Sequence, residues 1–328
     1  MTGSITRRAA LLGAAALLAP GTLHAQGAGD YPNRPIRLVV PWPPGGPIDL
    51  AARPVAQRMA ELLGQPVVIE NRAGANGTIG AAHVAQATPD GYTLLIASPG
   101  TVSIHPLARG ERGYDPLKLY APISQLVSSP SVLITRPDLP ARTLAELVAF
   151  AKANPGKLTY GSAGPASINH LSGATLAAMA GVEMLHVPYQ GAAPMMNDII
   201  AGRVDMAFTG IGVASRLMRE GKVRGLALGN ARRSPALPDV PTVGETYAGF
   251  QADNWYGLLA PTGTPQPIVQ KLHATAVAAV NSPEVRRVLE SGGVEPAPSE
   301  SPAAFAEMFL EDLERWRRAV RVAGLSSD

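Results

Sequence analysis

The stretch VVPWPPGGPIDLAARPVAQRM, Val39–Met59, decides how we expect the first third of the chain to fold. An apolar run leads into Trp42, two prolines and a glycine pair, after which apolar residues recur at helical spacing. This order predicts a strand, a tight loop and a helix. The first N–H groups of that helix lack partners within the helix and lie at the positive end of its dipole, so the loop is a candidate anion site.

Each residue type in this loop has a physical reason to be there. Gly45 and Gly46 carry no Cβ and let a ligand oxygen approach the main chain. Pro43 and Pro44 restrict the loop, and Asp49 can cap the start of the helix. A tight turn without a ligand is the alternative interpretation, and the loop alone does not decide between the two.

Composition excludes several classes of protein. The chain has 328 residues, which is long enough for two lobes, each with a core of its own. It has no cysteine, which excludes disulfide frameworks, thiolate metal sites and cysteine nucleophiles.

Residues 1–25 are typical of an export signal peptide. Two arginines precede an apolar run of small residues, 9–19, that is too short to span a bilayer, and residues 23–25 form a plausible cleavage site. The arginine pair leaves the twin-arginine and the general secretory routes both open. We expect a mature chain that begins near Gln26 in the periplasm and has no segment inserted in the membrane.

The signal peptide also affects how the charge is interpreted. The chain has 28 basic and 25 acidic residues, and two of the basic residues lie in the signal. The nearly neutral balance that remains gives no reason to expect nucleic acid as a partner. Basic runs such as residues 314–321 are expected to form solvated faces.

Strand-length and helix-length segments alternate along the mature chain. Apolar runs of strand length lie at residues 36–40, 67–70, 93–97, 131–135, 158–160, 184–187, 206–209 and 223–228. Helical patterns lie between them at residues 50–63, 78–87, 144–153, 169–180 and 195–201. This alternation predicts an α/β protein with parallel sheets covered by helices.

Two long extended segments, 120–140 and 222–241, indicate where the chain divides. Two such crossings are typical of two lobes joined by two strands, and one large continuous sheet is the other interpretation. We expect residues 26–126 and 227–328 to form the first lobe and residues 127–226 to form the second.

Two further loops repeat the pattern of the first. YGSAGPASINHLSGATLAAM, residues 160–179, and SPGTVSIHP, residues 98–106, both follow strands with loops that are rich in glycine and hydroxyl side chains. Loops at the carboxyl ends of parallel strands line ligand clefts in α/β proteins. The three loops therefore predict a cleft between the lobes.

The other motifs argue against an enzyme. NRAGANGTIG, residues 71–80, lacks the glycine spacing of a dinucleotide site, and we interpret it as a structural turn. Ser162 lacks both the GxSxG pattern and a matching base. The histidines of the mature chain lack the spacing of metal ligands. We therefore expect no catalysis, no metal and no cofactor.

Four segments in order carry a resemblance to a known family. YPNRPIRLVVPWPPGGPIDLAARPVAQRMAELLGQPVVIENRAGANGTIGAAHVAQATPDGYTLLIAS is followed by HVPYQGAAPMMNDIIAGRVDMAFTG, RSPALPDVPTVGE and WYGLLAPTGTP. Together they resemble the tripartite tricarboxylate transporter receptor family, also called Bug proteins. The resemblance implies a periplasmic solute-binding protein of the type II periplasmic-binding fold, in which two crossover strands join two α/β lobes around a ligand cleft.

The same resemblance implies most of the residues that would line the cleft. Together with Asp49 and Asp253, the candidate ligand-binding residues are Trp42, Pro43, Pro44, Gly45, Gly46, Ser98, Gly100, Thr101, Ser162, Ala163, Gly164, Ser167, His170, Tyr189, Gln190, Gly191 and Asp205. Many relatives have small residues in place of the Trp-Pro-Pro run, and the bulkier loop favours a ligand with an apolar or aromatic body.

Some of these residues have a second interpretation. His170 is equally a polar residue in the first turn of a helix, and Tyr189 a core aromatic. For Asp205, bonding to backbone N–H groups in its turn is favoured over contact with the ligand. Asp253 would repel a second carboxylate or pair with an amine if it faces the cleft, whereas the nearby Trp255 is expected to pack half-buried within a strand.

The resemblance implies a monomeric receptor for a small carboxylate, whether a dicarboxylic, aromatic or amino acid. It would close its lobes on this ligand and present it to a membrane transporter. A ligand-binding signalling module that docks on a sensor protein when closed is the alternative.

Overall fold

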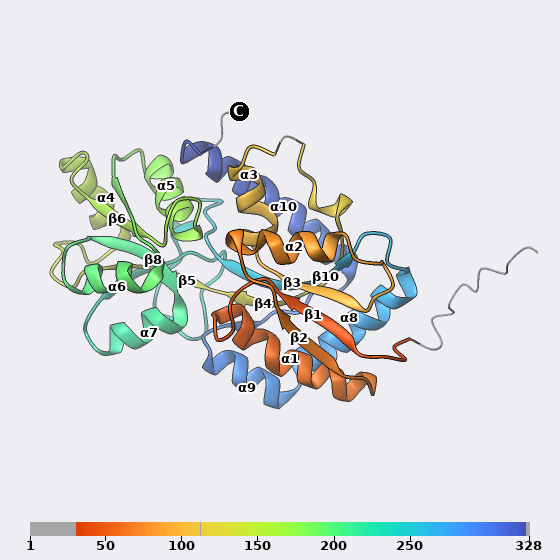
Figure 1. The fold of residues 1–328 in the computed structure, drawn as a ribbon. Coiled ribbons are helices and arrows are strands. Elements are labelled where there is room, and N and C mark those ends of the chain that lie inside the picture. Colours follow the sequence, from red (N-terminus) through yellow and green to blue (C-terminus); the bar gives the residue numbers. More distant parts are fainter. Residues whose placement is uncertain (1–30, 112, 326–328) are drawn as a thin grey trace, which may run out of the picture. The chain divides into compact units, whose positions relative to one another are not determined.

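Two mixed sheets organise the chain, one in each lobe (Figure 1). The computed structural model describes residues 31–111 and 113–325, so the predicted signal peptide lies outside the described residues. In Figure 1 the N-terminal and C-terminal thirds of the described chain share one sheet, and the middle third has the other.

The first sheet has the strand order β11-β4-β10-β3-β1-β2. Its strands are β1 (Ile36–Val40), β2 (Val67–Asn71), β3 (Thr93–Ala97), β4 (Tyr120–Ser129), β10 (Asn254–Pro261) and β11 (Glu295–Pro296). Strand β1 is parallel to β2 and β3, whereas β10 runs antiparallel to β3 and β4.

The second sheet has the order β7-β6-β8-β5-β9. Its strands are β5 (Ser131–Thr135), β6 (Thr159–Ser162), β7 (Leu185–Pro188), β8 (Met206–Gly210) and β9 (Arg224–Leu228). Strand β6 is parallel to β7 and β8, whereas β5 runs antiparallel to β8 and β9.

The order β2-β1-β3-β10-β4 of the first sheet corresponds to the order β7-β6-β8-β5-β9 of the second, and the first sheet adds β11, which is antiparallel to β4. In each sheet one antiparallel strand arrives from the other lobe. Strand β5 begins directly after β4 of the first sheet, and β10 follows the second lobe. The expectation of parallel sheets was therefore wrong for the crossover strands. A strand that returns from a neighbouring lobe needs no crossover helix and can pair antiparallel.

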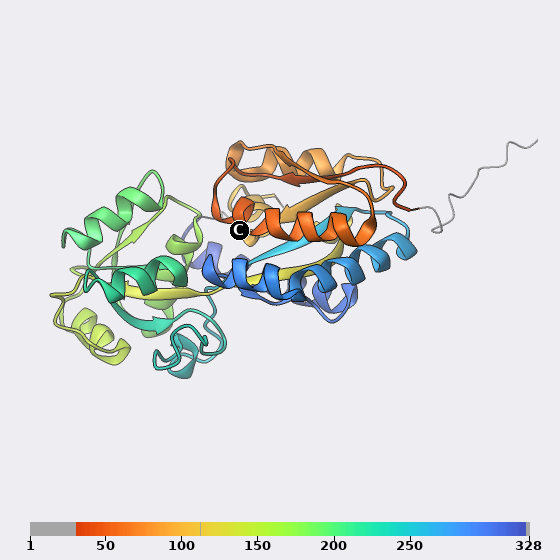
Figure 2. The same cartoon turned by 90° about the horizontal axis from the view of Figure 1, so that it is seen from below.

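Helices cover both faces of each sheet (Figures 1 and 2). In the first lobe they are α1 (Pro47–Leu63), α2 (Thr78–Ala85), α3 (His105–Ala108), α8 (Gln266–Asn281), α9 (Pro283–Ser291) and α10 (Pro302–Val322). In the second lobe they are α4 (Leu144–Ala153), α5 (Ile168–Ala180), α6 (Ala192–Ile200) and α7 (Ile211–Arg219). Short helical turns are η2 (Ala75–Gly77), η3 (Gly100–Ile104), η4 (Pro116–Lys118) and η5 (Val243–Glu245). None of the helices in the described part of the chain is both long and apolar enough to span a bilayer.

The sheets divide the chain near the predicted boundaries, but the second crossing comes later. Strand β4 continues to Ser129 before β5 starts, and β9 ends at Leu228. The segment that follows β9 still packs on the second lobe, because Val243 and Phe250 lie in the same apolar cluster as Phe208. The crossing back to the first sheet therefore lies just before β10.

An aromatic cluster holds α10 against the first sheet. Trp255 of β10 packs edge-on against Phe305 and Phe309, with ring centroids 5.5 and 5.3 Å apart. All three side chains are buried. The expectation that Trp255 packs within a strand is confirmed, but its side chain is fully buried where half-burial was expected.

We predict that Phe309→Ala lowers the free energy of unfolding by about 3–5 kcal/mol, because it opens a cavity beside Trp255. The neighbouring Leu310 is 41% exposed and provides a matched control, since Leu310→Ala should change stability by only about 0.5 kcal/mol. Urea unfolding followed by circular dichroism measures both variants. Equal losses in the two variants would contradict the packing described.

Candidate ligand-binding site

The first candidate loop, residues 41–46, joins β1 to α1. Gly45 has a φ of 80°, a left-handed conformation that a residue with a Cβ adopts only under strain. Gly46 is the N-cap of α1, with φ −73° and ψ 165°, and no side chain caps the helix there. Its N–H lies 3.4 Å from the Pro43 carbonyl oxygen, which closes the turn.

At the start of α1, two backbone N–H groups have no carbonyl acceptor within the helix. The first hydrogen bond back into the loop runs from Leu50 N–H to the Gly46 carbonyl oxygen at 2.9 Å. The N–H groups of Ile48 and Asp49 precede it and lie at the positive end of the helix dipole. These amides are the main-chain donors that the first loop can offer to an anion.

Asp49 holds the loop in place. Its side chain is fully buried, and Oδ2 accepts the Gly45 N–H at 2.9 Å. Arg53 donates to both carboxylate oxygens, at 2.8 and 3.0 Å, and Asn71 donates to Oδ1 at 3.0 Å. Burial alone would raise the pKa of Asp49, but these hydrogen bonds outweigh it and lower the pKa. Asp49 thus bonds the loop and its neighbours instead of capping the helix.

The second loop meets the first at Trp42. Strand β3 is parallel to β1 and ends beside it, so η3 follows from the same edge of the sheet. Trp42 Nε1 donates to Thr101 Oγ1 at 3.3 Å, and Ser98 Oγ lies 3.4 Å from the same Thr101 oxygen. Gly100 begins η3, which is a π-helical turn. The structure therefore brings together the predicted residues of both loops.

The third loop follows β6 in the second lobe. Ser162 ends the strand, and its Oγ accepts the Gly164 N–H at 3.1 Å. Gly164, at the turn after Ala163, has a φ of 125°. Ser167 is the N-cap of α5, and its hydroxyl accepts the His170 N–H at 3.3 Å. Helix α5 thus begins with free amides, as α1 does.

The PYQG segment lies directly beside this third loop. Tyr189 N–H donates to the Ser162 carbonyl oxygen at 3.0 Å. The Tyr189 hydroxyl donates to Asp198 Oδ2 at 2.7 Å, so it is bonded to α6. Gln190 and Gly191 follow, and Gly191 is the N-cap of α6 with a φ of 111°. The segment supplies a second helix start next to Ser162.

Two stacked histidines lie against Ser162. His186 Nε2 is 2.6 Å from Ser162 Oγ, and the rings of His186 and His170 stack with centroids 3.8 Å apart. His170 is 6% exposed, and its Nδ1 accepts the Ala166 N–H at 3.4 Å. Burial lowers the pKa of His186, and burial together with His186 lowers the pKa of His170 to about 4. Both rings are therefore neutral near pH 7 and bond to the loop.

Comparison with known proteins assigns the chain to a family. Residues 51–325 match the family described as the tripartite tricarboxylate transporter family receptor. The chain belongs to this receptor family. It is 38% identical over 319 residues, 97% of this chain and 94% of the relative, to the UPF0065 protein in the tcbD-tcbE intergenic region of Pseudomonas sp. (strain P51).

Solved structures of similar sequence have the same fold as this chain. A protein of R. palustris, solved with adipate, is 34% identical with a TM-score of 0.73 and covers 90% of this chain and 99% of its own. MatC from Rhodopseudomonas palustris, solved with bound malate, is 35% identical with a TM-score of 0.72 and covers 88% and 100%. The chain is thus a two-lobed solute-binding receptor of this family, as its resemblance implied.

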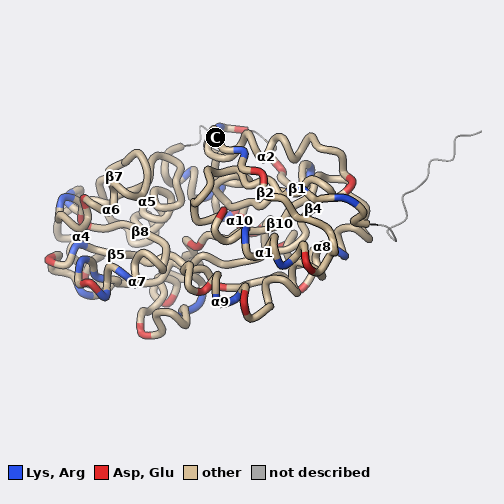
Figure 3. The backbone as a smooth tube through the Cα atoms, turned by 60° about the horizontal axis from the view of Figure 1, so that its bottom comes forward, with Lys and Arg blue, Asp and Glu red and all other residues tan. Residues whose placement is uncertain are grey.

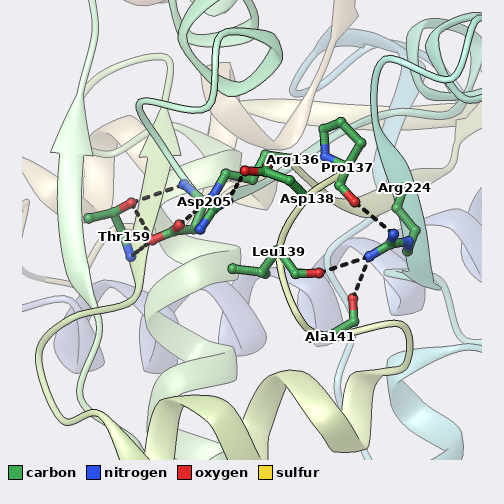
Figure 4. Close-up of polar contacts among 8 residues, drawn as sticks. All are labelled: Arg136, Pro137, Asp138, Leu139, Ala141, Thr159, Asp205 and Arg224. Atoms are coloured by element: carbon green, nitrogen blue, oxygen red, sulfur yellow. Dashed lines mark hydrogen bonds and ion pairs between the residues drawn. The ribbon is translucent and has the colours of Figure 1, made fainter.

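Asp205 lies at the other end of the second sheet of this receptor (Figure 4). Its carboxylate accepts the Arg136 Nε–H and the Thr159 N–H and hydroxyl, each at 2.8 Å. Thr159 begins β6 and Ser162 ends it, so about 10 Å of strand separates Asp205 from the third loop. The structure does not bring Asp205 together with the other candidate residues.

Asp253 lies just before β10, at the edge where β3 ends, because Gly257 pairs with Ala97. Burial raises the pKa of Asp253, and Arg315 Nη1 lies 3.5 Å from its Oδ1. Arg315 also bonds Asp312, whose pKa burial raises to about 6. The Arg315 side chain is only 17% exposed and faces buried carboxylates. The expectation that residues 314–321 form a solvated face was therefore wrong at Arg315.

Four of the residues that sequence reasoning missed are central to the candidate loops or Asp253. Arg53 and Asn71 bond Asp49, His186 bonds Ser162, and Arg315 pairs with Asp253. Asn71 stood in the glycine-rich segment that was interpreted as structural, and His186 stood two residues before the PYQG motif, which begins at Pro188. Their positions beside the loops arise from strand pairing, which is not a local property of the sequence.

The histidine pair predicts that stability depends on pH. The pKa of His170 is about 4 in the folded protein, against an ordinary value of 6.5. Between these values the unfolded chain binds more protons, so this contribution to stability is complete above about pH 6.5 and is lost as the pH falls toward 4. His170→Gln should flatten the decline by up to about 1.4 kcal/mol per pH unit in urea unfolding.

Tyr160 stacks on the same rings, with its centroid 5.0 Å from that of His186, and is a matched control. Tyr160→Phe keeps the ring and leaves the histidine pair in place, so its decline should follow that of the wild type. A decline in His170→Gln as steep as in the wild type would show that His170 is not the group that titrates.

Proposed function

We propose that the protein is a periplasmic receptor that holds a small carboxylate at the strand-end loops of its two lobes and delivers it to a membrane transporter. One observation carries this proposal: in each lobe a strand ends in a short glycine-containing loop, residues 41–46 before α1 and 163–167 before α5, that leads into a helix with free amides. Such helix starts bind anions without a basic side chain.

The candidate loops contain no basic residue, which supports binding of the carboxylate by uncharged hydrogen-bond donors. Residues 41–46, 98–103 and 163–167 contain no lysine or arginine. Arg53 of the helix that follows the first loop donates to both oxygens of Asp49. Acidic and basic residues are interspersed over both lobes in Figure 3. A carboxylate would therefore be neutralised by amides, hydroxyls and helix dipoles.

The relatives solved with ligand support a diacid in particular. One was solved with adipate and MatC with malate, both of which are dicarboxylates. A carboxylate at each end of the ligand would suit one helix start in each lobe. The exposed prolines Pro43 and Pro44 beside Trp42 offer apolar surface, which favours a ligand with an apolar or aromatic body over the most compact diacids.

The family and the N-terminal sequence support the remaining parts of the proposal. Membership in a transporter receptor family supports a membrane transporter as partner. Two arginines followed by a short apolar run support export to the periplasm. A ligand that contacts both lobes binds the closed state better than the open one and shifts the population toward it, which gives the transporter a state to recognise.

A thermal-shift screen tests the ligand class. Small mono- and dicarboxylic acids should raise the melting temperature, since a ligand that binds only the native state adds about 2.7 kcal/mol at a hundredfold excess over Kd. Sugars, cationic amines and nucleotides should leave it unchanged. If the best acid is a diacid, its diamide is the matched control, because it keeps the carbon chain and loses both charges. A screen in which the diamide scored as well as the acid would contradict a carboxylate site.

A further inference from the structure

Asn71 joins the two ends of the first candidate loop. It is the last residue of β2 and lies opposite Val40, the last residue of β1. Its Nδ2 donates to the Trp42 carbonyl oxygen and to Asp49 Oδ1, both at 3.0 Å. One amide group thus connects the start of the 41–46 loop to the first turn of α1.

Through its bond to Asp49, Asn71 also helps to hold the rest of the loop in place. Asp49 Oδ2 accepts the Gly45 N–H, and Arg53 donates to both oxygens from the following turn of α1. Asp49 is fully buried, so its carboxylate depends on these protein donors in place of water. A shift of Asp49 would therefore move the Gly45 amide and the start of the helix.

The turn that follows Asn71 packs directly against the first two candidate loops. A Cβ at Gly77 would lie 2.8 Å from Thr101 Oγ1, and a Cβ at Gly80 would lie 2.9 Å from Pro41 Cβ. Gly77 also has a φ of 88°. The glycines allow a contact closer than side chains permit, which fixes Asn71 relative to both loops.

We propose that Asn71 is a positioning residue that sets the direction of the Ile48 and Asp49 amides at the start of α1. This inference rests on the proposed site in the first lobe. The geometry requires one planar group with two N–H donors, aimed at a carbonyl oxygen and at a carboxylate. Aspartate has the same shape with acceptors only, and leucine has a similar size with neither.

Calorimetry with the acid that the screen identifies tests the effect on binding. Asn71→Leu and Asn71→Asp should each weaken binding about tenfold to a hundredfold near pH 7.5, the range expected for lost hydrogen bonds to a charged group. Val68→Ala changes a half-exposed residue of the same strand and should bind as the wild type does. Wild-type affinity in both Asn71 variants would overturn the proposal.

The pH dependence separates positioning by hydrogen bonds from a general loss of structure. In Asn71→Asp the introduced carboxyl faces Asp49, which Arg53 of α1 bonds, with Glu70 and Arg72 paired on either side of it in the chain. Repulsion from Asp49 raises its pKa and the Arg53 cation opposes this shift, so the carboxyl regains a proton and one donor as the pH is lowered. Affinity relative to wild type at the same pH should then recover in Asn71→Asp and stay low in Asn71→Leu. A loss without recovery would overturn the hydrogen-bond role.

Amide hydrogen exchange without ligand gives a readout that does not depend on the proposed function. The Gly45 amide should exchange faster in both Asn71 variants than in the wild type, because its acceptor is no longer held. If no acid binds the wild type, the proposed function fails, while faster exchange at Gly45 still supports the role of Asn71. Unchanged exchange at Gly45 in both variants would overturn that role even if the wild type binds acids.

Discussion

The parallel strands β1, β2 and β3 end at one edge of their sheet, and the candidate site depends on this constraint. Val40 pairs with Asn71, and Val39 pairs with Leu95, so the segments that follow all three strands leave from the same edge. A helix that starts at such an edge directs its free amides toward whatever lies beyond it. The second sheet repeats the arrangement with β6, β7 and β8.

Several arginines are already paired with aspartates, which leaves the helix-start amides as donors for a ligand carboxylate. Arg53 bonds Asp49, Arg136 bonds Asp205 and Arg315 bonds Asp312. Each of these arginines is neutralised by an aspartate of its own lobe. A ligand carboxylate would have to break such a pair to use one of these three arginines, whereas the helix starts need no rearrangement.

Local sequence patterns predicted the strands well and the pairing poorly. The bounds of β1, β3 and β5 agree with the predicted runs, because short apolar segments between turn residues are a local signal. The antiparallel direction of β5 and β10 was missed, since it depends on which lobe a strand comes from. The segment after β9 was assigned to the wrong lobe for the same reason: Val243 and Phe250 pack on residues distant in sequence.

The same distinction applies to the candidate site. Glycine and hydroxyl residues at strand ends predicted the loops, and the structure brings Trp42, Ser98 and Thr101 together. Asn71 and Arg315 could not be found in this way, because the groups they bond come from other elements of the fold.

The central claim is that main-chain amides at the helix starts hold the ligand carboxylate. Nuclear magnetic resonance of deuterated, ¹⁵N-labelled protein, titrated with the acid that gives the largest thermal shift, tests it most directly. The account predicts that the amide protons of Ile48, Asp49 and Asn169 move to lower field on saturation, as they do when an amide gains a charged acceptor. Unmoved amides together with shifted side-chain resonances of an arginine would contradict it and show that an ion pair holds the ligand.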